Sequence, residues 1–110
     1  MAVKIPEFIL SGMFVRGSLA ATQSGFSFCI KNTYAPGTVE GFGLEVDGNP
    51  VPPSDLSLRV ETDTEPRPVP SITEREPYPL PVDTLLEVCV DRPLPERGDL
   101  RLHVTTREVG

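Results

Sequence analysis

Apolar and polar residues alternate with a period of two along several stretches of the chain, and this restricts the fold more than any other feature. The alternation is clearest over 26–31 (FSFCIK), 56–61 (LSLRVE) and 100–105 (LRLHVT), and it recurs less cleanly over 85–90 (LLEVCV). Successive side chains of a β-strand point to opposite faces, so each stretch predicts a strand with one face on a core. No stretch repeats apolar residues at helical spacing. The sequence therefore predicts an all-β protein.

Turn residues separate these stretches and suggest how the strands connect. Asp47-Gly48 lies between apolar runs and is typical of a tight hairpin turn. Two further strands are expected near residues 8–21 and 39–47, and a turn near 94–99 (LPERGD). With 110 residues the chain has the size of one domain. We expect residues 1–110 to form a single antiparallel β-sandwich or jelly roll.

Residues 65–81 (EPRPVPSITEREPYPLP) interrupt this rhythm with six of the thirteen prolines of the chain. Proline has no backbone N–H, so the segment should be an extended, stiff loop outside the regular sheet ladder. Connections of this length usually have a function or are disordered. Its apolar side chains are suited to docking, either on the sandwich itself or on a partner; they are Val69, Ile72, Tyr78 and Leu80.

Four glycines at 37, 41, 43 and 48 raise the possibility of a phosphate-binding loop. Such a loop leads into a helix whose free amides face the anion. Here the glycines interrupt a strand pattern and no G-K-[ST] sequence follows. We interpret Gly41 and Gly43 as a bend or bulge in a strand.

Candidate catalytic groups are scarce. The chain has one histidine, His103, in the outward phase of the last expected strand, and two cysteines, Cys29 and Cys89. Nucleophilic catalysis would have to combine His103 with one of these thiols, but the spacing gives no support beyond the residue types. A surface or interface histidine is the preferred interpretation. A Cys29–Cys89 disulfide is arithmetically possible, and two reduced thiols are preferred because no secretion signal is evident.

Glu61, Asp63 and Glu65 alternate at the end of an expected strand, so their carboxylates can share one face. Such a group can bind a hard cation or act as a carboxylate pair on a sugar. Alternating acids at a strand end more often form a solvated edge that resists aggregation, and we prefer that interpretation.

The net charge of the chain restricts the kinds of partner that it is expected to bind. Sixteen acidic and ten basic residues give a net charge of -6. No basic stripe marks a nucleic-acid surface. The apolar run over 8–15 is too short to span a membrane and lacks the layout of a signal peptide. A cytoplasmic protein with no nucleic-acid or membrane partner is expected.

Two stretches resemble the small β-subunit family of bacterial C-glycoside deglycosidases: 25–58 (GFSFCIKNTYAPGTVEGFGLEVDGNPVPPSDLSL) and 94–104 (LPERGDLRLHV). The shared features are a GFSF-like strand, a segment with an aromatic residue and a glycine, a VDG hairpin and a turn before the last strand. The chain departs from the family at Tyr34-Ala35-Pro36-Gly37, where longer members have a YRG-like segment. It departs again at Gly98-Asp99-Leu100, where they have a GEH-like turn. Roles tied to that arginine or histidine are not carried over.

The resemblance implies a β-sandwich that pairs with a larger (β/α)₈ barrel subunit. That partner would hold a divalent metal, manganese by expectation, and the catalytic base. The complex would be a carbon–carbon lyase that cleaves the C–C glycosidic bond of 3-oxo-C-glycosides. No catalytic residue, metal ligand or cofactor is expected in this chain, which would stabilise the barrel and shape its substrate pocket.

The residues expected to contact the partner or line the pocket are Tyr34, Pro36, Tyr78 and Leu80. The alternative is a stand-alone β-sandwich that binds carbohydrate or protein. The absence of tryptophan weakens the carbohydrate version, because sugar-binding platforms usually need stacked aromatic rings.

Overall fold

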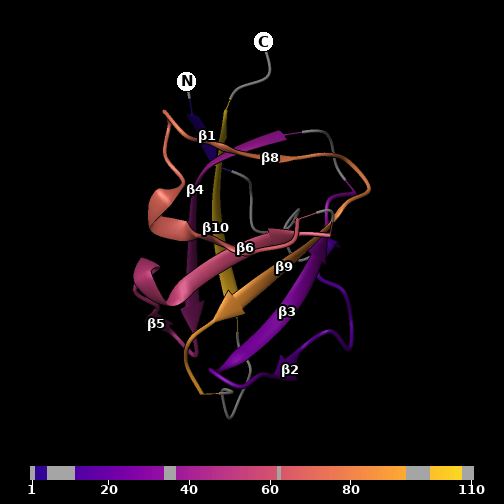
Figure 1. Ribbon diagram of the computed structural model, residues 1–110, viewed down its shortest axis with the longest axis vertical. Coiled ribbons are helices and arrows are strands. Elements are labelled where there is room, and N and C mark those ends of the chain that lie inside the picture. Colours follow the sequence, from indigo (N-terminus) through magenta and orange to yellow (C-terminus); the bar gives the residue numbers. More distant parts are fainter. Residues whose placement is uncertain (1, 5–11, 34–36, 62, 94–99, 108–110) are drawn as a thin grey trace.

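The computed structural model describes residues 2–4, 12–33, 37–61, 63–93 and 100–107. These residues form two five-stranded antiparallel sheets that face each other, with only short helical turns between strands. Figure 1 shows the two layers, with β3, β9 and β6 in front of β4 and β10. The prediction of an all-β antiparallel sandwich is confirmed.

The sheet that we call sheet A has the strand order β1-β10-β4-β5, and β8 also pairs with β4. Its two long strands, β4 and β10, pair along most of their length. The register shifts between Thr105 and Thr106, opposite Gly41 and Val39, so β4 carries an irregularity beside Gly41. Gly43 pairs regularly with His103. The strands are β1 (Ala2–Lys4), β4 (Gly37–Val46), β5 (Asn49–Pro50), β8 (Tyr78–Leu80) and β10 (Leu100–Arg107).

The opposite layer, sheet B, has the order β2-β3-β9-β6-β7. Its centre is β9, which pairs with β3 on one side and β6 on the other. Each of these three strands buries every second residue, as the alternation predicts. The strands are β2 (Ala20–Ala21), β3 (Phe26–Lys31), β6 (Leu56–Val60), β7 (Arg67–Pro68) and β9 (Leu85–Val90).

The core lies between the two sheets. Phe26, Phe28, Leu58 and Val88 are completely buried, and sheet A covers them with residues that include Val39. Burying a large aliphatic or aromatic side chain stabilises a fold by roughly 1.5–3 kcal/mol. The inward residues of the alternating stretches therefore supply most of the driving force for folding.

The connections confirm the expected turn chemistry at one place and correct it at another. Asp47 and Gly48 have φ values of 50° and 85°, the positive pair that a tight hairpin turn requires, and they join β4 to β5. The strand expected near 8–21 is mostly missing in the described part of that stretch. There, only Phe14 forms an isolated bridge, and β2 covers two residues. The stretches 34–36 and 94–99, which include Tyr34, Pro36 and the expected turn, lie outside the described residues.

The proline-rich segment folds back onto its own sandwich. It contains β7, a helical turn η2 (Val69–Ser71) and β8. Val69, Ile72, Tyr78 and Leu80 are each at most 7% exposed. A second helical turn, η1 (Pro53–Asp55), precedes β6. Of the two docking alternatives for these four side chains, the structure therefore shows packing on the chain itself.

Candidate functional site

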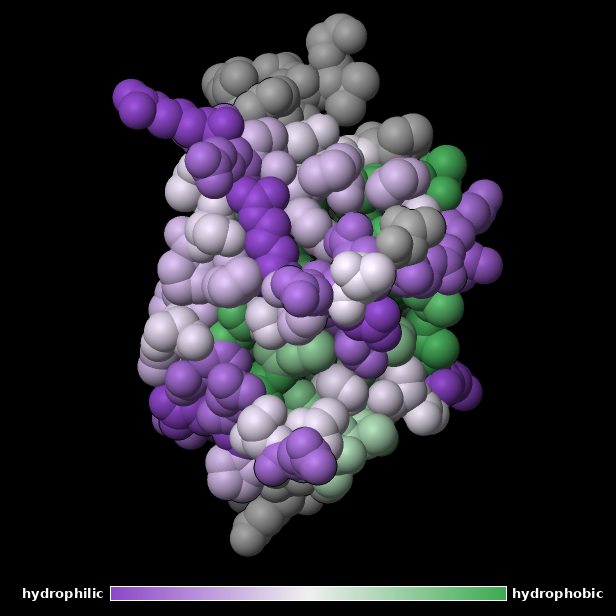
Figure 2. Space-filling view, in the orientation of Figure 1, coloured by the Kyte–Doolittle hydropathy of each residue, from purple (hydrophilic) through white to green (hydrophobic). Residues whose placement is uncertain are grey.

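The outer face of sheet B, on the side of the molecule seen in Figure 2, carries both thiols. Cys29 on β3 lies opposite Glu87 on β9, and Cys89 lies opposite Ser27. The two thiols thus occupy diagonal positions, which typically separates Cα atoms by about 7–8 Å, whereas a disulfide needs about 4.4–6.8 Å. Both cysteines are free thiols, as the sequence favoured.

The surroundings of the thiols disfavour the thiolate. Burial, reinforced by the negative charge of Glu87, raises the pKa of Cys89 to about 11 and raises that of Cys29 as well. Glu87 also accepts hydrogen bonds from the Cys89 thiol (3.5 Å) and from Nε of Arg59 (3.2 Å). The thiolate is the nucleophilic form of cysteine. These positions are therefore unlike those of catalytic cysteines.

The histidine lies in the other layer. His103 on β10 faces outward from sheet A, and its Nε2 lies 2.7 Å from a carboxylate oxygen of Glu45 on β4. The side chains are 43% and 31% exposed. The two thiols face outward from sheet B, on the opposite side of the core. The combination of His103 with Cys29 or Cys89 is therefore excluded by geometry.

Beside His103 the surface of β4 has no side chains at two consecutive outward positions, Gly41 and Gly43. In the register of the sheet Gly43 lies opposite His103, and Gly41 lies opposite Thr105. At these two positions β4 presents only backbone, next to the row of outward side chains on β10. We call the row of side chains the ridge and the two glycine positions the trough of sheet A.

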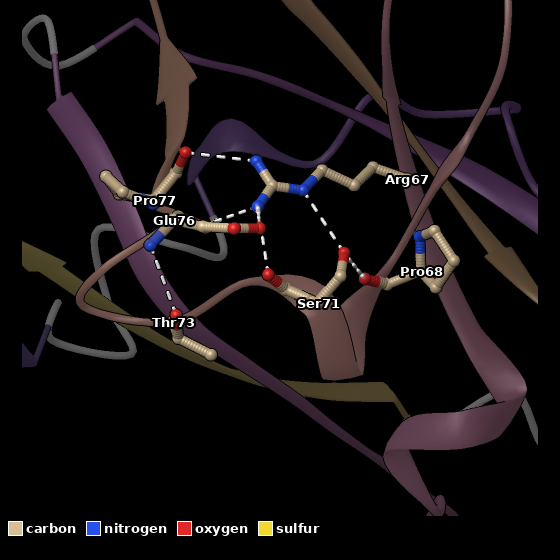
Figure 3. A network of polar contacts seen from close by, with 6 residues as sticks. All are labelled: Arg67, Pro68, Ser71, Thr73, Glu76 and Pro77. Atoms are coloured by element: carbon tan, nitrogen blue, oxygen red, sulfur yellow. Dashed lines mark hydrogen bonds and ion pairs between the residues drawn. The ribbon is translucent and has the colours of Figure 1, made fainter.

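The proline-rich segment is organised by Arg67 (Figure 3). Its guanidinium donates to the carbonyl oxygens of Ser71 (2.9 Å) and Pro77 (3.0 Å), to the backbone oxygen of Glu76, and to the hydroxyl of Ser71. The same guanidinium lies 5.8 Å from the centre of the Tyr78 ring. A planar cation with five donors suits such a convergence of carbonyl groups. Arg67 therefore holds the ends of the loop together.

Of the three alternating acids, one has a specific structural partner. Asp63 accepts a hydrogen bond from the hydroxyl of Tyr78, and that hydroxyl accepts one from the backbone N–H of Val60 (2.8 Å). Glu61 and Glu65 are exposed. Among the described residues, no three His, Cys, Asp or Glu side chains are arranged to hold a metal ion.

The expected contact residues have different positions. Tyr78 and Leu80 lie in the core with 5% and 7% of their surface exposed, so each has little left to offer a partner. Tyr34 and Pro36 lie outside the described residues, and their role stays a prediction. Asn32, for which the sequence predicted no role, is buried and stands two positions before Tyr34 in the chain. Its side chain donates to the carbonyl oxygens of Leu80 (3.1 Å) and Pro81 (3.3 Å).

Sequence reasoning missed Glu45, Arg67 and Asn32 as organising residues. The link between Glu45 and His103 spans 58 positions and depends on strand register. The sequence gives one signal for Arg67, which is its position among prolines. Because proline has no backbone N–H, carbonyl groups in such a segment have few backbone donors, and an arginine side chain can donate to them instead. Asn32 follows a strand directly, where a side-chain amide often satisfies free backbone groups.

The fold and these sites together define a small antiparallel β-sandwich whose described residues assemble no recognisable catalytic group. Within the described residues, no helix is long and apolar enough to cross a membrane. A family model for the hydroxymethylglutaryl-CoA reductase N-terminal domain matches residues 9–110, and the chain belongs to this family. Comparison with curated proteins and with solved structures gives no match.

The family match corrects the resemblance drawn from the sequence. The chain is not a β-subunit of a C-glycoside deglycosidase, and its assignment to a carbon–carbon lyase is wrong, because the matching family is one of reductase domains. The motifs behind the resemblance were alternation and turn residues, which many β-sandwiches share. The alternative of a stand-alone binding module gains no support from the match. The barrel partner, its metal and the 3-oxo-C-glycoside were implied by the same resemblance, and the described residues do not test them.

Proposed function

We propose that this chain is a β-sandwich domain of a hydroxymethylglutaryl-CoA reductase-related protein, acting next to the part that carries out the reduction. The family match over residues 9–110 carries this proposal. In this role the sandwich binds and stabilises the reductase part, and the hydride transfer takes place elsewhere.

The chemistry of the described side chains supports this division of roles. The two thiols have raised pKa values, and the imidazole of His103 is bound to Glu45 on a surface that faces away from both thiols. A general acid or base needs a neighbouring group with which it converges on one substrate atom. The described residues offer no such convergence, whereas the packed core and the Arg67 network provide a rigid scaffold.

Measurements with and without a reductase catalytic polypeptide from the same organism test the proposal. The purified chain alone should not consume hydroxymethylglutaryl-CoA when a hydride donor is supplied. Added to the catalytic polypeptide, it should bind saturably and raise that polypeptide's thermal midpoint, because a ligand of the folded state stabilises it. Heat-unfolded chain at the same concentration is the control. Turnover by the chain alone, lost on His103→Ala, would contradict the proposal, and so would a lack of binding at any concentration tested.

We also propose that the protein is located in the cytoplasm. Two free thiols on one sheet face support it, because such thiols persist in a reducing environment. Fractionation of cells followed by detection of the chain would test it.

A further inference from the structure

The ridge and trough of sheet A are complementary to each other, and this points to a second copy of the chain. The ridge on β10 carries Arg101, His103 and Thr105. In the register of the sheet these lie opposite Glu45, Gly43 and Gly41 of β4. Large side chains thus stand beside glycines, and a cation stands beside an anion, on two adjacent strands.

The fold itself does not require glycine at the bottom of the trough. A Cβ atom added at Gly43 would come no closer than 3.6 Å to His103, and one at Gly41 no closer than 3.6 Å to Thr105. Both distances are ordinary contacts, and neither glycine has a positive φ. Glycine within a strand weakens it because no side chain packs there. Gly41 lies beside the register shift of β4, as expected for a bulge, whereas neither crowding nor backbone conformation accounts for Gly43 within the monomer.

We propose that two copies associate face to face through sheet A about a two-fold axis parallel to β4 and β10. Rotation about an axis midway between these strands places the ridge of each copy on the trough of the other. Heights along the strands are kept, so Arg101 of the second copy lies over Glu45 and His103 of the second copy over Gly43. Every contact then occurs twice, as in an isologous dimer.

The alternative two-fold axis, perpendicular to the strands, would place ridge on ridge and trough on trough. It would bring His103 against its own copy and leave the glycines facing an empty space. Packed sheets keep their strands roughly aligned and about 10 Å apart, which the parallel axis allows. The complementarity thus selects one symmetry operation.

The size and charge of the face set the conditions for observing the dimer. Sheet A has two strands of 8 and 10 residues and three of only 2 or 3, which together cover roughly 400 Å² per copy. Two copies would bury roughly 800 Å² in total, less than the roughly 1,200–2,000 Å² of stable specific interfaces, so the dimer is a weak one. Each copy has a net charge of -6, and this repulsion is screened beyond about 8 Å at physiological ionic strength. The dimer should therefore be sought at micromolar to millimolar concentrations in physiological salt.

Sedimentation velocity over a concentration series of the full chain tests the proposal. Wild type should change from monomer to dimer as its concentration rises. Gly43→Gln fills the trough and should remain monomeric at concentrations at which wild type is dimeric. Gly12→Gln is the matched control, because an added Cβ at this exposed glycine meets nothing within 4 Å, and it should dimerise like wild type. Circular dichroism and a thermal melt check that both variants are folded.

A charge exchange gives a second readout, which decides the question even if Gly43→Gln fails to fold. Arg101→Glu alone and Glu45→Arg alone each place like charges opposite one another and should weaken the dimer at least tenfold. The double variant restores opposite charges and should recover it. A monomer at all concentrations would overturn the proposal. So would a dimer that survives the folded Gly43→Gln variant, or single charge variants that dimerise as well as wild type.

Discussion

The hydroxyl of Tyr78 connects three parts of the chain, and removing it should measurably destabilise the fold. It accepts a hydrogen bond from the Val60 N–H on β6 and donates one to Asp63. In Tyr78→Phe the Val60 N–H loses its partner inside a buried region. Leaving such a donor unsatisfied costs about 1–3 kcal/mol, and a bond to a charged group contributes about 1.5–3 kcal/mol. Because one hydroxyl makes both bonds, we expect a total loss of about 2–4 kcal/mol in the free energy of unfolding.

Urea unfolding followed by far-UV circular dichroism measures this loss. The transition midpoint should fall while the m-value stays unchanged, since the buried surface is the same. Asp63→Asn is the matched control: its amide oxygen can still accept the bond but lacks the charge, so its loss should be the smaller one. A loss below about 0.5 kcal/mol for Tyr78→Phe would place it among ordinary surface changes and refute the reasoning.

The same hydroxyl predicts a pH dependence with a definite sign. Burial and the bond to Asp63 raise the pKa of Tyr78 from 10.0 to about 12. Above pH 10 the unfolded chain loses this proton while the folded chain keeps it. The stability contributed by the neutral phenol is therefore fully present below pH 10 and is lost as the pH rises toward 12. The stability difference between wild type and Tyr78→Phe should shrink over that range. The thiols are present in both chains, so their titration cancels in the difference.

Three further predictions concern individual glycines, Arg67 and the two thiols. Gly25→Ala should destabilise the fold by more than about 2 kcal/mol in a thermal melt, because its Cβ would lie 2.0 Å from a backbone carbonyl oxygen. Gly43→Ala should be nearly neutral, and an equal loss of stability in the two variants would contradict this difference. Arg67→Lys should lower stability by about 1–2 kcal/mol and speed amide hydrogen exchange in the proline-rich segment, because an ammonium cannot reach the same set of carbonyl groups; unchanged exchange would exclude that role. Cys29 and Cys89 should react slowly with a disulfide reagent at pH 8 and faster toward pH 11, since their pKa values are raised; fast reaction at neutral pH would show that the thiols are activated.

The alternation of apolar and polar residues predicted the strands, because strand formation depends on neighbouring residues. It did not predict the positions of side chains that are determined by contacts between distant residues. The strands at 26–31, 56–60 and 100–107 follow it directly, and so does the outward direction of His103. Tyr78 and Leu80 were expected at a contact surface because they are apolar side chains of the proline-rich segment, yet their spacing of two is also strand spacing. They pair with β4 and are buried. Whether the two side chains are buried or exposed depends on pairing with a strand some forty residues earlier in the chain. The residues around Tyr78 and Leu80 do not reveal that pairing.

Recognising the family failed for a related reason. Turn residues and alternation are needed by any antiparallel sandwich, so a match in these features carries information about fold and little about chemistry. Contacts made by side chains would have been more specific, such as those of Arg67 with backbone carbonyl groups or of Glu45 with His103. They become visible only once the register of the strands is known.

The glycines show how the structure separates the demands of folding from those of function. Gly25 is required by a backbone contact and Gly48 by its φ of 85°. Gly41 lies beside the register shift of β4, and Gly43 meets none of these conditions, although it lies on a strand where a side chain would add packing. Glycine at position 43 adds no packing to its strand, and the neighbouring β10 places Arg101 opposite Glu45. The proposed interface explains this arrangement better than the demands of the monomer do. The bulge that the sequence suggested is found beside Gly41, and the register with β10 adds the pairing of Gly43 with His103 on which the proposed dimer depends.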